Sequence, residues 1–313
     1  MRVKREESRV PQVQANGISI EYESLGPQDA PVILLIMGLG AQLTRWPQQF
    51  CEKLAGRGYR VVRFDNRDIG LSTRFDAAPV PDLGQIIAAR MAGRPADVPY
   101  MLNDMGADTV GLMDALDIRQ AHIVGASMGG MIAQVVAADY PERVLSLTSI
   151  MSTTSNPMLP PPTPAATTVL MTRAPNPSDR EAFVAHGLNT FRTIGSPAYP
   201  FDEAVARERL LADAARSYNP AGVGRQLAAV TASGDRRNQV RRIRAPTVVL
   251  HGADDPLVPV ARGRDTAECI AGAELRIIPG MGHDFPPALY DTIIDAIESA
   301  IVRARTTDQG NSQ

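Results

Sequence analysis

The stretch that decides the fold reads A-H-I-V-G-A-S-M-G-G at residues 121–130. Its apolar start is typical of a buried strand, and a helix-forming run, residues 131–139, follows directly after the glycines. We therefore predict a strand, a sharp turn and a helix, with Ser127 at the turn. Because so tight a turn holds its serine in a strained conformation and leaves no room for bulky neighbours, glycine is expected at positions 125 and 129.

Strand patterns alternate with helix patterns on both sides of this stretch. Buried or alternating apolar runs occupy residues 32–37, 60–65 and 144–150, with helical spacing between them, and residues 12–22 have the pattern of a β-hairpin. This alternation predicts an α/β protein with a doubly wound, mostly parallel sheet. In such sheets functional residues gather at the carboxyl ends of the strands, where Gly38, Asp65 and Ser127 are expected.

The alternation stops after Ile150. Residues 158–164 are rich in proline, and the chain from there to about residue 241 has helical patterns only, before strands resume at 247–252 and 275–280. We predict an α/β core at 12–152 and 242–305, with a helical lid at 153–241 inserted late in the sheet, a flexible arm at 1–11 and a disordered tail at 306–313. The irregular stretch 77–100 could join the rim of the lid. A separate helical domain is the alternative.

Composition restricts the class of protein. The chain has 313 residues, is 44% hydrophobic and 21% charged, and carries a formal net charge of −2, as expected for a soluble globular protein. No extended basic run offers electrostatic attraction to nucleic acid. The longest apolar run, Val32 to Met37, is too short to cross a membrane, and the first residues are too polar for a signal peptide. We expect a cytoplasmic protein with Cys51 and Cys269 as free thiols.

A serine at such a turn becomes a nucleophile when a general base and an orienting acid lie beside it. Of the four histidines, His283 lies in a G-M-G-H turn after the last strand, where it can approach Ser127. His122 starts its strand at the wrong end, His186 lies in the insertion, and His251 ends a strand as a residue that we expect to be packed. His283 is therefore the predicted base.

The orienting acid is expected in the loop G-A-D-D-P-L-V-P at residues 252–259. Only one of two adjacent carboxylates can face the base. We choose Asp255, because Pro256 keeps its backbone extended. Asp254 is expected to accept hydrogen bonds from turn amides.

An attacked carbonyl also needs fixed hydrogen-bond donors for the negative charge that develops on its oxygen. We predict an oxyanion hole formed by the backbone N–H groups of Met128, directly after the serine, and Leu39, in the loop after the strand at 32–37. The flanking glycines, Gly38 and Gly40, allow that loop to turn inward.

Together, G-A-S-M-G at 125–129, H-G-A-D-D-P-L-V-P at 251–259 and P-G-M-G-H at 279–283 resemble the α/β-hydrolase superfamily over nearly the whole chain. L-L-I-M-G-L-G at 34–40 and R-F-D-N-R-D-I-G-L-S-T at 63–73 are similar to the group that contains aclacinomycin methylesterase. Many relatives have His-Gly where this chain has Met37-Gly38, a substitution which that group shares. The resemblance favours Asp255 as the acid, makes Gly125 and Gly129 the glycines of the nucleophile elbow, and implies a structural role for Asp65 and Arg67.

The resemblance implies a serine hydrolase of the carboxylesterase type with a Ser127-His283-Asp255 triad that acts through an acyl-enzyme. We expect small to medium apolar esters as substrates, because the lid sequence has no obvious charged clusters. No cofactor, metal, nucleic acid or membrane partner is expected, and a homodimer is left open. A carbon–carbon bond hydrolase, a cofactor-free perhydrolase or haloperoxidase, and a non-catalytic ligand-binding receptor are the alternatives. Four aromatic residues are candidates to line a pocket or simply to pack: Trp46, Tyr199, Phe201 and Tyr218.

Overall fold

The computed structural model describes residues 11–310, and its centre is an eight-stranded sheet with the order β1-β2-β4-β3-β5-β6-β7-β8. β1 and β2 form the expected antiparallel hairpin, and β2 also pairs antiparallel with β4. From β4 across to β8 all neighbours are parallel, so the predicted fold class is confirmed. The strands are β1 (Gln12–Ala15), β2 (Ile18–Leu25), β3 (Val32–Ile36), β4 (Arg60–Phe64), β5 (Ala121–Ala126), β6 (Val144–Ile150), β7 (Thr247–Gly252) and β8 (Glu274–Ile278).

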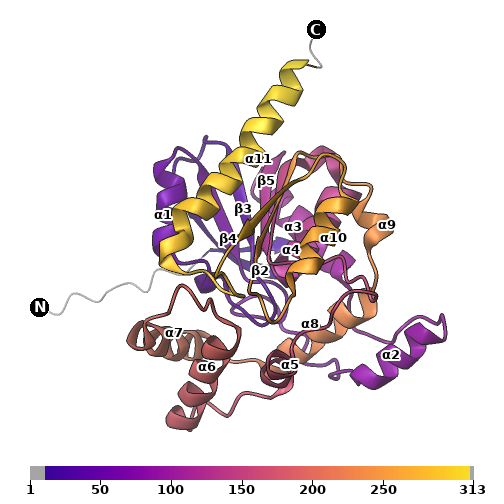
Figure 1. The fold of residues 1–313 in the computed structure, drawn as a ribbon, viewed down its shortest axis with the longest axis vertical. Helices are drawn as coiled ribbons and strands as arrows, with labels where there is room; N and C mark the ends of the chain where they lie inside the picture. The colour runs from indigo at the N-terminus through magenta and orange to yellow at the C-terminus, as the bar shows by residue number, and fades with distance from the viewer. Residues whose placement is uncertain (1–10, 311–313) are drawn as a thin grey trace, which may run out of the picture.

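Helices cover both faces of the sheet (Figure 1). Alternate residues along β3 point to opposite faces: Ile33 and Leu35 pack in one apolar cluster with α1 and α11, and Leu34 and Ile36 pack in another with α3 and α4. The central strands are therefore buried on both sides. The helices are α1 (Gln48–Gly56), α2 (Leu83–Met91), α3 (Leu102–Ala115), α4 (Met128–Asp139), α5 (Pro164–Met171), α6 (Arg180–Ile194), α7 (Glu203–Arg216), α8 (Pro220–Ser233), α9 (Arg237–Val240), α10 (Val260–Cys269) and α11 (Tyr290–Gly310).

The chain between β6 and β7 is helical, and residues 151–246, all of which are described, contain no strand. Figure 1 shows α5, α6, α7 and α8 gathered at one end of the sheet. Each of these helices starts at a side chain that accepts a hydrogen bond from a backbone N–H of the first turn, an arrangement that satisfies an otherwise unpaired donor. The capping residues are Thr163, Asp179, Asp202 and Asn219.

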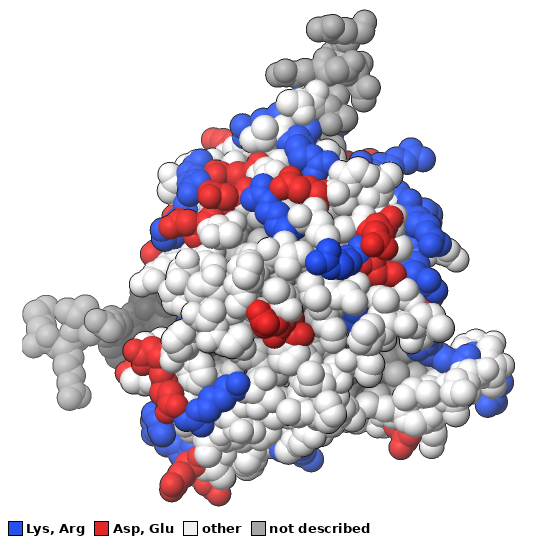
Figure 2. Space-filling model, viewed as in Figure 1, with Lys and Arg blue, Asp and Glu red and all other residues white. Residues whose placement is uncertain are grey.

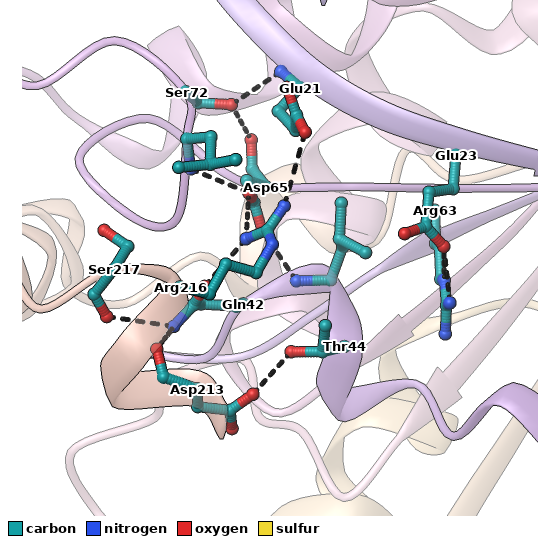
Figure 3. Close-up of polar contacts among 12 residues, drawn as sticks. Glu21, Glu23, Gln42, Thr44, Arg63, Asp65, Ser72, Asp213, Arg216 and Ser217 are labelled. Atoms are coloured by element: carbon teal, nitrogen blue, oxygen red, sulfur yellow. Dashed lines mark hydrogen bonds and ion pairs between the residues drawn. The ribbon is translucent and has the colours of Figure 1, made fainter. Parts of the chain in front are cut away.

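Arg216, at the end of α7, holds the insertion to the core. Its Nη1 donates to Asp65 Oδ2 and to Gln42 Oε1, both at 2.7 Å, and its Nη2 lies 3.6 Å from Glu21 Oε1. Figure 3 shows the guanidinium extending from α7 to this pair of carboxylates. Burial raises the pKa of both Asp65 and Glu21. The cation of Arg216 therefore partly offsets the cost of burying two acidic groups in one place.

Asp65 and Arg67 have the structural role that the resemblance implied. Asp65 Oδ1 accepts a hydrogen bond from Leu43 N at 2.7 Å, which fixes the segment that follows the loop after β3. Arg67 Nε donates to Asp108 Oδ2 at 2.6 Å, and both side chains are buried. Either charge buried without the other would be unfavourable, so each side chain stabilises the other in the core.

The C-terminal end of the chain differs from the prediction. α11 continues to Gly310, where a disordered tail from residue 306 was expected, and that expectation is wrong for residues 306–310. Once the first turns of a helix are packed, each further residue adds a backbone hydrogen bond, so a polar sequence can prolong it. The predicted arm at residues 1–10 and the last three residues lie outside the described part of the chain. Within residues 11–310, no helix combines the length and apolarity needed to span a bilayer.

Candidate active site

Ser127 lies on the predicted turn between β5 and α4. Its backbone has φ 56° and ψ −121°, a strained conformation for a residue with a side chain, and its N–H donates to Ile150 O at 2.9 Å. Glycine is required at positions 125 and 129, because a larger residue would collide with the backbone. A Cβ at Gly125 would overlap the carbonyl of Gly129, and a Cβ at Gly129 would overlap the carbonyl of Ile36. The tight packing of this turn presents the serine hydroxyl at the carboxyl end of β5.

The structure brings Ser127, His283 and Asp255 together from three distant parts of the chain. His283 Nε2 lies 2.9 Å from Ser127 Oγ, and His283 Nδ1 lies 2.7 Å from Asp255 Oδ2. Both distances are within hydrogen-bonding range, with the imidazole between the hydroxyl and the carboxylate. An imidazole in this position can accept the hydroxyl proton while the carboxylate fixes its orientation and tautomer.

Asp255 is held by its own loop. Its Oδ1 accepts hydrogen bonds from Leu257 N at 2.9 Å and Val258 N at 2.7 Å, which leaves Oδ2 for the imidazole of His283. The neighbouring Asp254 faces elsewhere, and its Oδ2 accepts from Gly280 N at 2.8 Å, the contact with a turn amide that the sequence predicts. The two adjacent carboxylates therefore have separate partners.

Two of the other histidines are packed residues of the core. His122 Nδ1 lies 2.8 Å from Ser146 Oγ, and burial lowers the pKa of His122 to about 4. His251 Nε2 lies 2.7 Å from Val258 O, and burial lowers its pKa as well. His251 therefore supports the loop that carries Asp255, a contact that the sequence did not reveal.

The four aromatic residues that the sequence analysis named as pocket candidates contact other rings or backbone groups. Trp46 is fully buried, with ring centroids 5.7 Å from Phe50 and 5.0 Å from Phe285. Phe201 packs against Phe191 in the insertion. These two side chains therefore pack against other rings, which is one of the two roles that the sequence analysis left open. The hydroxyl of Tyr199 donates to Pro279 O. The hydroxyl of Tyr218 donates to the backbone oxygens of Ala174 and Pro175.

The loop after β3 passes directly beside the serine. A Cβ built on Gly38 would lie 3.1 Å from Ser127 Cβ, a contact so tight that the neighbouring atoms would have to shift. In residues 11–310 no hydrogen bond ties the backbone N–H of Leu39 or of Met128 to another group. Neither donor is thus occupied by another group of the described chain, which is a requirement for an oxyanion hole.

Two polar side chains that the sequence analysis missed hold this loop. Asn66 Nδ2 donates to Met37 O at 2.9 Å. Gln226, on α8, accepts from Gly40 N at 2.9 Å and donates to Arg67 O at 2.9 Å. Gln226 is fully buried, so both ends of its amide find partners and the loop is clamped between the core and the insertion.

Side chains of both charges are mixed on the surface of the molecule. On the face shown in Figure 2, Lys and Arg are interspersed with Asp and Glu around a broad uncharged area. Among residues 11–310 there is no group of three or more His, Cys, Asp or Glu side chains arranged to hold a metal ion. His186, the fourth histidine, lies on α6 in the insertion.

Comparison with known proteins places these observations in context. A family model described as the alpha/beta hydrolase fold matches residues 31–286. Rhodomycin D methylesterase DnrP of Streptomyces peucetius is 30% identical over 310 residues, which cover 92% of this chain and 96% of that protein. Rhodomycin D methylesterase DauP of Streptomyces sp. (strain C5) is 29% identical over 309 residues, with the same coverage of each chain.

A solved structure of another protein has the same backbone fold. The crystal structure of a hydrolase from Pseudomonas aeruginosa PA01 superposes with a TM-score of 0.66 at 25% identity, covering 93% of this chain and 99% of that one. The similarity thus extends over the sheet and the helical insertion together.

Proposed function

This chain belongs to the α/β-hydrolase family, and we propose that it is a carboxylic-ester hydrolase that works through an acyl-enzyme on Ser127. Its similarity to two methylesterases supports ester hydrolysis as the reaction. The observation that carries the proposal is the position of the His283 imidazole, within hydrogen-bonding distance of both Ser127 Oγ and Asp255 Oδ2.

In the first half of the reaction, Ser127 Oγ attacks the ester carbonyl carbon while His283 Nε2 takes the hydroxyl proton. The carbonyl oxygen becomes an oxyanion beside the N–H groups of Leu39 and Met128. When the tetrahedral species collapses, the bond to the alcohol oxygen breaks and His283 gives that oxygen the proton. The alcohol leaves, and the acyl group remains on Ser127 as an ester.

In the second half, His283 removes a proton from water as the water attacks the acyl carbon, and then returns the proton to Ser127 Oγ. The carboxylic acid is released and the enzyme is regenerated. Asp255 stabilises the imidazolium that forms in each half without taking the proton itself. Its two backbone hydrogen bonds hold it in that role.

We also propose that the insertion, residues 153–241, is a lid over the substrate. The contact of Gln226 with the loop at Gly40 supports this, because it places α8 against the proposed oxyanion hole. The proposed substrates are small to medium apolar esters, and the names of the two relatives make methyl esters the first to test.

The test is a panel of methyl and p-nitrophenyl esters that varies the length of the acyl chain. Wild-type protein is expected to turn over several members, and Ser127→Ala is expected to lose at least about 10³-fold in kcat. Ser299→Ala, which removes a hydroxyl on α11 bonded to Glu274, is the matched control and is expected to retain activity. Full turnover by folded Ser127→Ala would show that another group carries the reaction.

A further inference from the structure

The loop that carries His283 is bound to the insertion as well as to the core. The N–H of His283 donates to Ile194 O at 2.7 Å, and Ile194 is the last residue of α6. Beyond Ile194, Ala198 N donates to the O of Gly280, which precedes His283 in the chain, at 3.2 Å. The backbone of His283 and the backbone before it are therefore tied to the end of α6 and to the segment that follows it.

Ser196 lies at the centre of this contact. Its hydroxyl donates to Asp284 Oδ1 and accepts from Gly282 N at 2.8 Å, so it bonds the residues directly before and after His283. Ser196 is only 6% exposed, and burial raises the pKa of the Asp284 carboxyl. Removing the hydroxyl would leave the buried N–H of Gly282 without its partner and would take one donor from the half-buried carboxyl of Asp284, which is unfavourable for both.

The two backbones also meet without a side chain between them. A Cβ on Gly282 would overlap the carbonyl oxygens of both Gly195 and Ile194. Contacts of this kind leave little room for the histidine loop to move relative to the end of α6.

We propose that Ser196 is a positioning residue for His283, so that the insertion holds the general base in place in addition to covering the substrate. The inference rests on the proposed function, since it concerns the alignment of the imidazole between Ser127 and Asp255. Ser196 acts only through the backbone of the histidine loop. Misplacing a catalytic group by about 1 Å can cost on the order of 10²-fold in rate, so even partial loosening of this loop is measurable.

The experiment compares kcat and KM of Ser196→Ala, Asp284→Ala and Asp284→Asn on an ester that the wild-type protein turns over. Ser196→Ala is expected to lower kcat about tenfold or more with KM changed less than about twofold, because the base is misaligned while the substrate contacts remain. Asp284→Ala removes the other partner of the same bond and is expected to resemble it. Asp284→Asn keeps an acceptor for the Ser196 hydroxyl and should recover most of kcat.

Thr193→Ala is the matched control. It removes a hydroxyl hydrogen bond from the end of α6, from Thr193 Oγ1 to Asn189 O at 2.8 Å, whose acceptor lies within α6 and not in the histidine loop. Its kcat should equal that of the wild type. If Ser196→Ala does not fold, the comparison of Asp284→Ala with Asp284→Asn decides the question.

Ser127→Ala is assayed in parallel to separate the two ideas. Loss of turnover in Ser127→Ala together with a wild-type kcat in Ser196→Ala and Asp284→Ala would overturn the positioning role and leave the proposed function intact. A rise in KM at constant kcat would also overturn it, since that pattern indicates lost substrate binding. Unchanged turnover in Ser127→Ala would instead refute the proposed function.

Discussion

Replacing Arg225 by methionine tests whether buried ion pairs attach the insertion to the core. Arg225, on α8, donates from Nε to Asp68 Oδ2 at 2.8 Å and from Nη2 to Asp68 Oδ1 at 2.7 Å. Asp68 is fully buried and also accepts from Tyr100 Oη at 2.6 Å and Phe75 N at 2.8 Å. The variant would leave this carboxylate buried with two neutral donors and no cation.

Breaking a buried pair by removing one partner typically costs about 3–5 kcal/mol. For a chain of this size that corresponds to a fall in Tm of about 6–10 °C, taking roughly 2 °C per kcal/mol. Adding Asp68→Asn to Arg225→Met removes the unpaired charge and is expected to recover part of the loss. The recovery distinguishes an uncompensated charge from a simple loss of packing.

The pH dependence of this effect has a definite sign. Burial pushes the pKa of Asp68 upward, but hydrogen bonds from Arg225 and Tyr100 outweigh it, and the net pKa is lowered. A carboxyl whose pKa is lower in the folded state stabilises the fold above its unfolded pKa, and the contribution disappears as the pH falls through the folded value. The difference in Tm between wild type and Arg225→Met should therefore shrink below about pH 4.

The assay is thermal unfolding followed by circular dichroism at pH 7 and at lower pH. Arg74→Met is the matched control, because Arg74 pairs with Asp76 at the surface at 3.1 Å and both side chains are exposed. Exposed pairs contribute about 0–1 kcal/mol, so this variant should unfold close to the wild type. A Tm for Arg225→Met no lower than that of Arg74→Met would refute the reasoning.

Three further predictions concern the elbow, a buried histidine and the thiols. Gly129→Ala is expected to abolish ester turnover or folding, because its Cβ would overlap a backbone carbonyl, whereas Gly56→Ala has open space and should be neutral in both assays. The pKa of His122 is about 4 in the folded protein, against about 6.5 in the unfolded chain. The free energy of unfolding should therefore fall by about 2 kcal/mol between pH 7 and pH 5. Urea midpoints should show that His122→Gln reduces this loss. Burial raises the pKa of Cys51 to about 11, so iodoacetamide at pH 8 should alkylate Cys51 only after denaturation, with half-buried Cys269 as the comparison by mass spectrometry.

The fold was predictable from local patterns. Continuous apolar runs at the positions of β3 and β5 indicate strands buried on both faces, and the spacing of glycines around Ser127 indicates the turn. The order of the serine, acid and histidine motifs along the chain placed Asp255 and His283 near Ser127, and the structure brings these residues together.

Short helices among prolines were harder to foresee. The sequence analysis placed residues 164–171 in a helical region without defining a helix there, and it described residues 77–100 as irregular. Pro164 begins α5 at a position where its missing N–H costs nothing, and Asp82 caps α2. The prolines at 158–164 indicate only that a strand cannot continue there, although proline at the first turn of a helix, as in α5, favours the helix.

The side-chain contacts that position the loops of the site could not be predicted from the sequence. Gln226 and Gly40 are separated by 186 positions, and Ser196 and Gly282 by 86. Pairing them requires knowing how the insertion packs on the core, which hydrophobic periodicity does not specify. Single polar residues such as Ser196 also occur at many surface positions, so their residue type gives no signal.

The most direct test of the account is covalent labelling of Ser127 by a fluorophosphonate, located by mass spectrometry of the digested protein. We expect one adduct per chain on the peptide that contains Ser127, no adduct in Ser127→Ala, and much slower labelling in His283→Ala, because the hydroxyl has lost its base. An adduct on another residue, or labelling of Ser127 at an unchanged rate in His283→Ala, would contradict the proposal that His283 activates this serine.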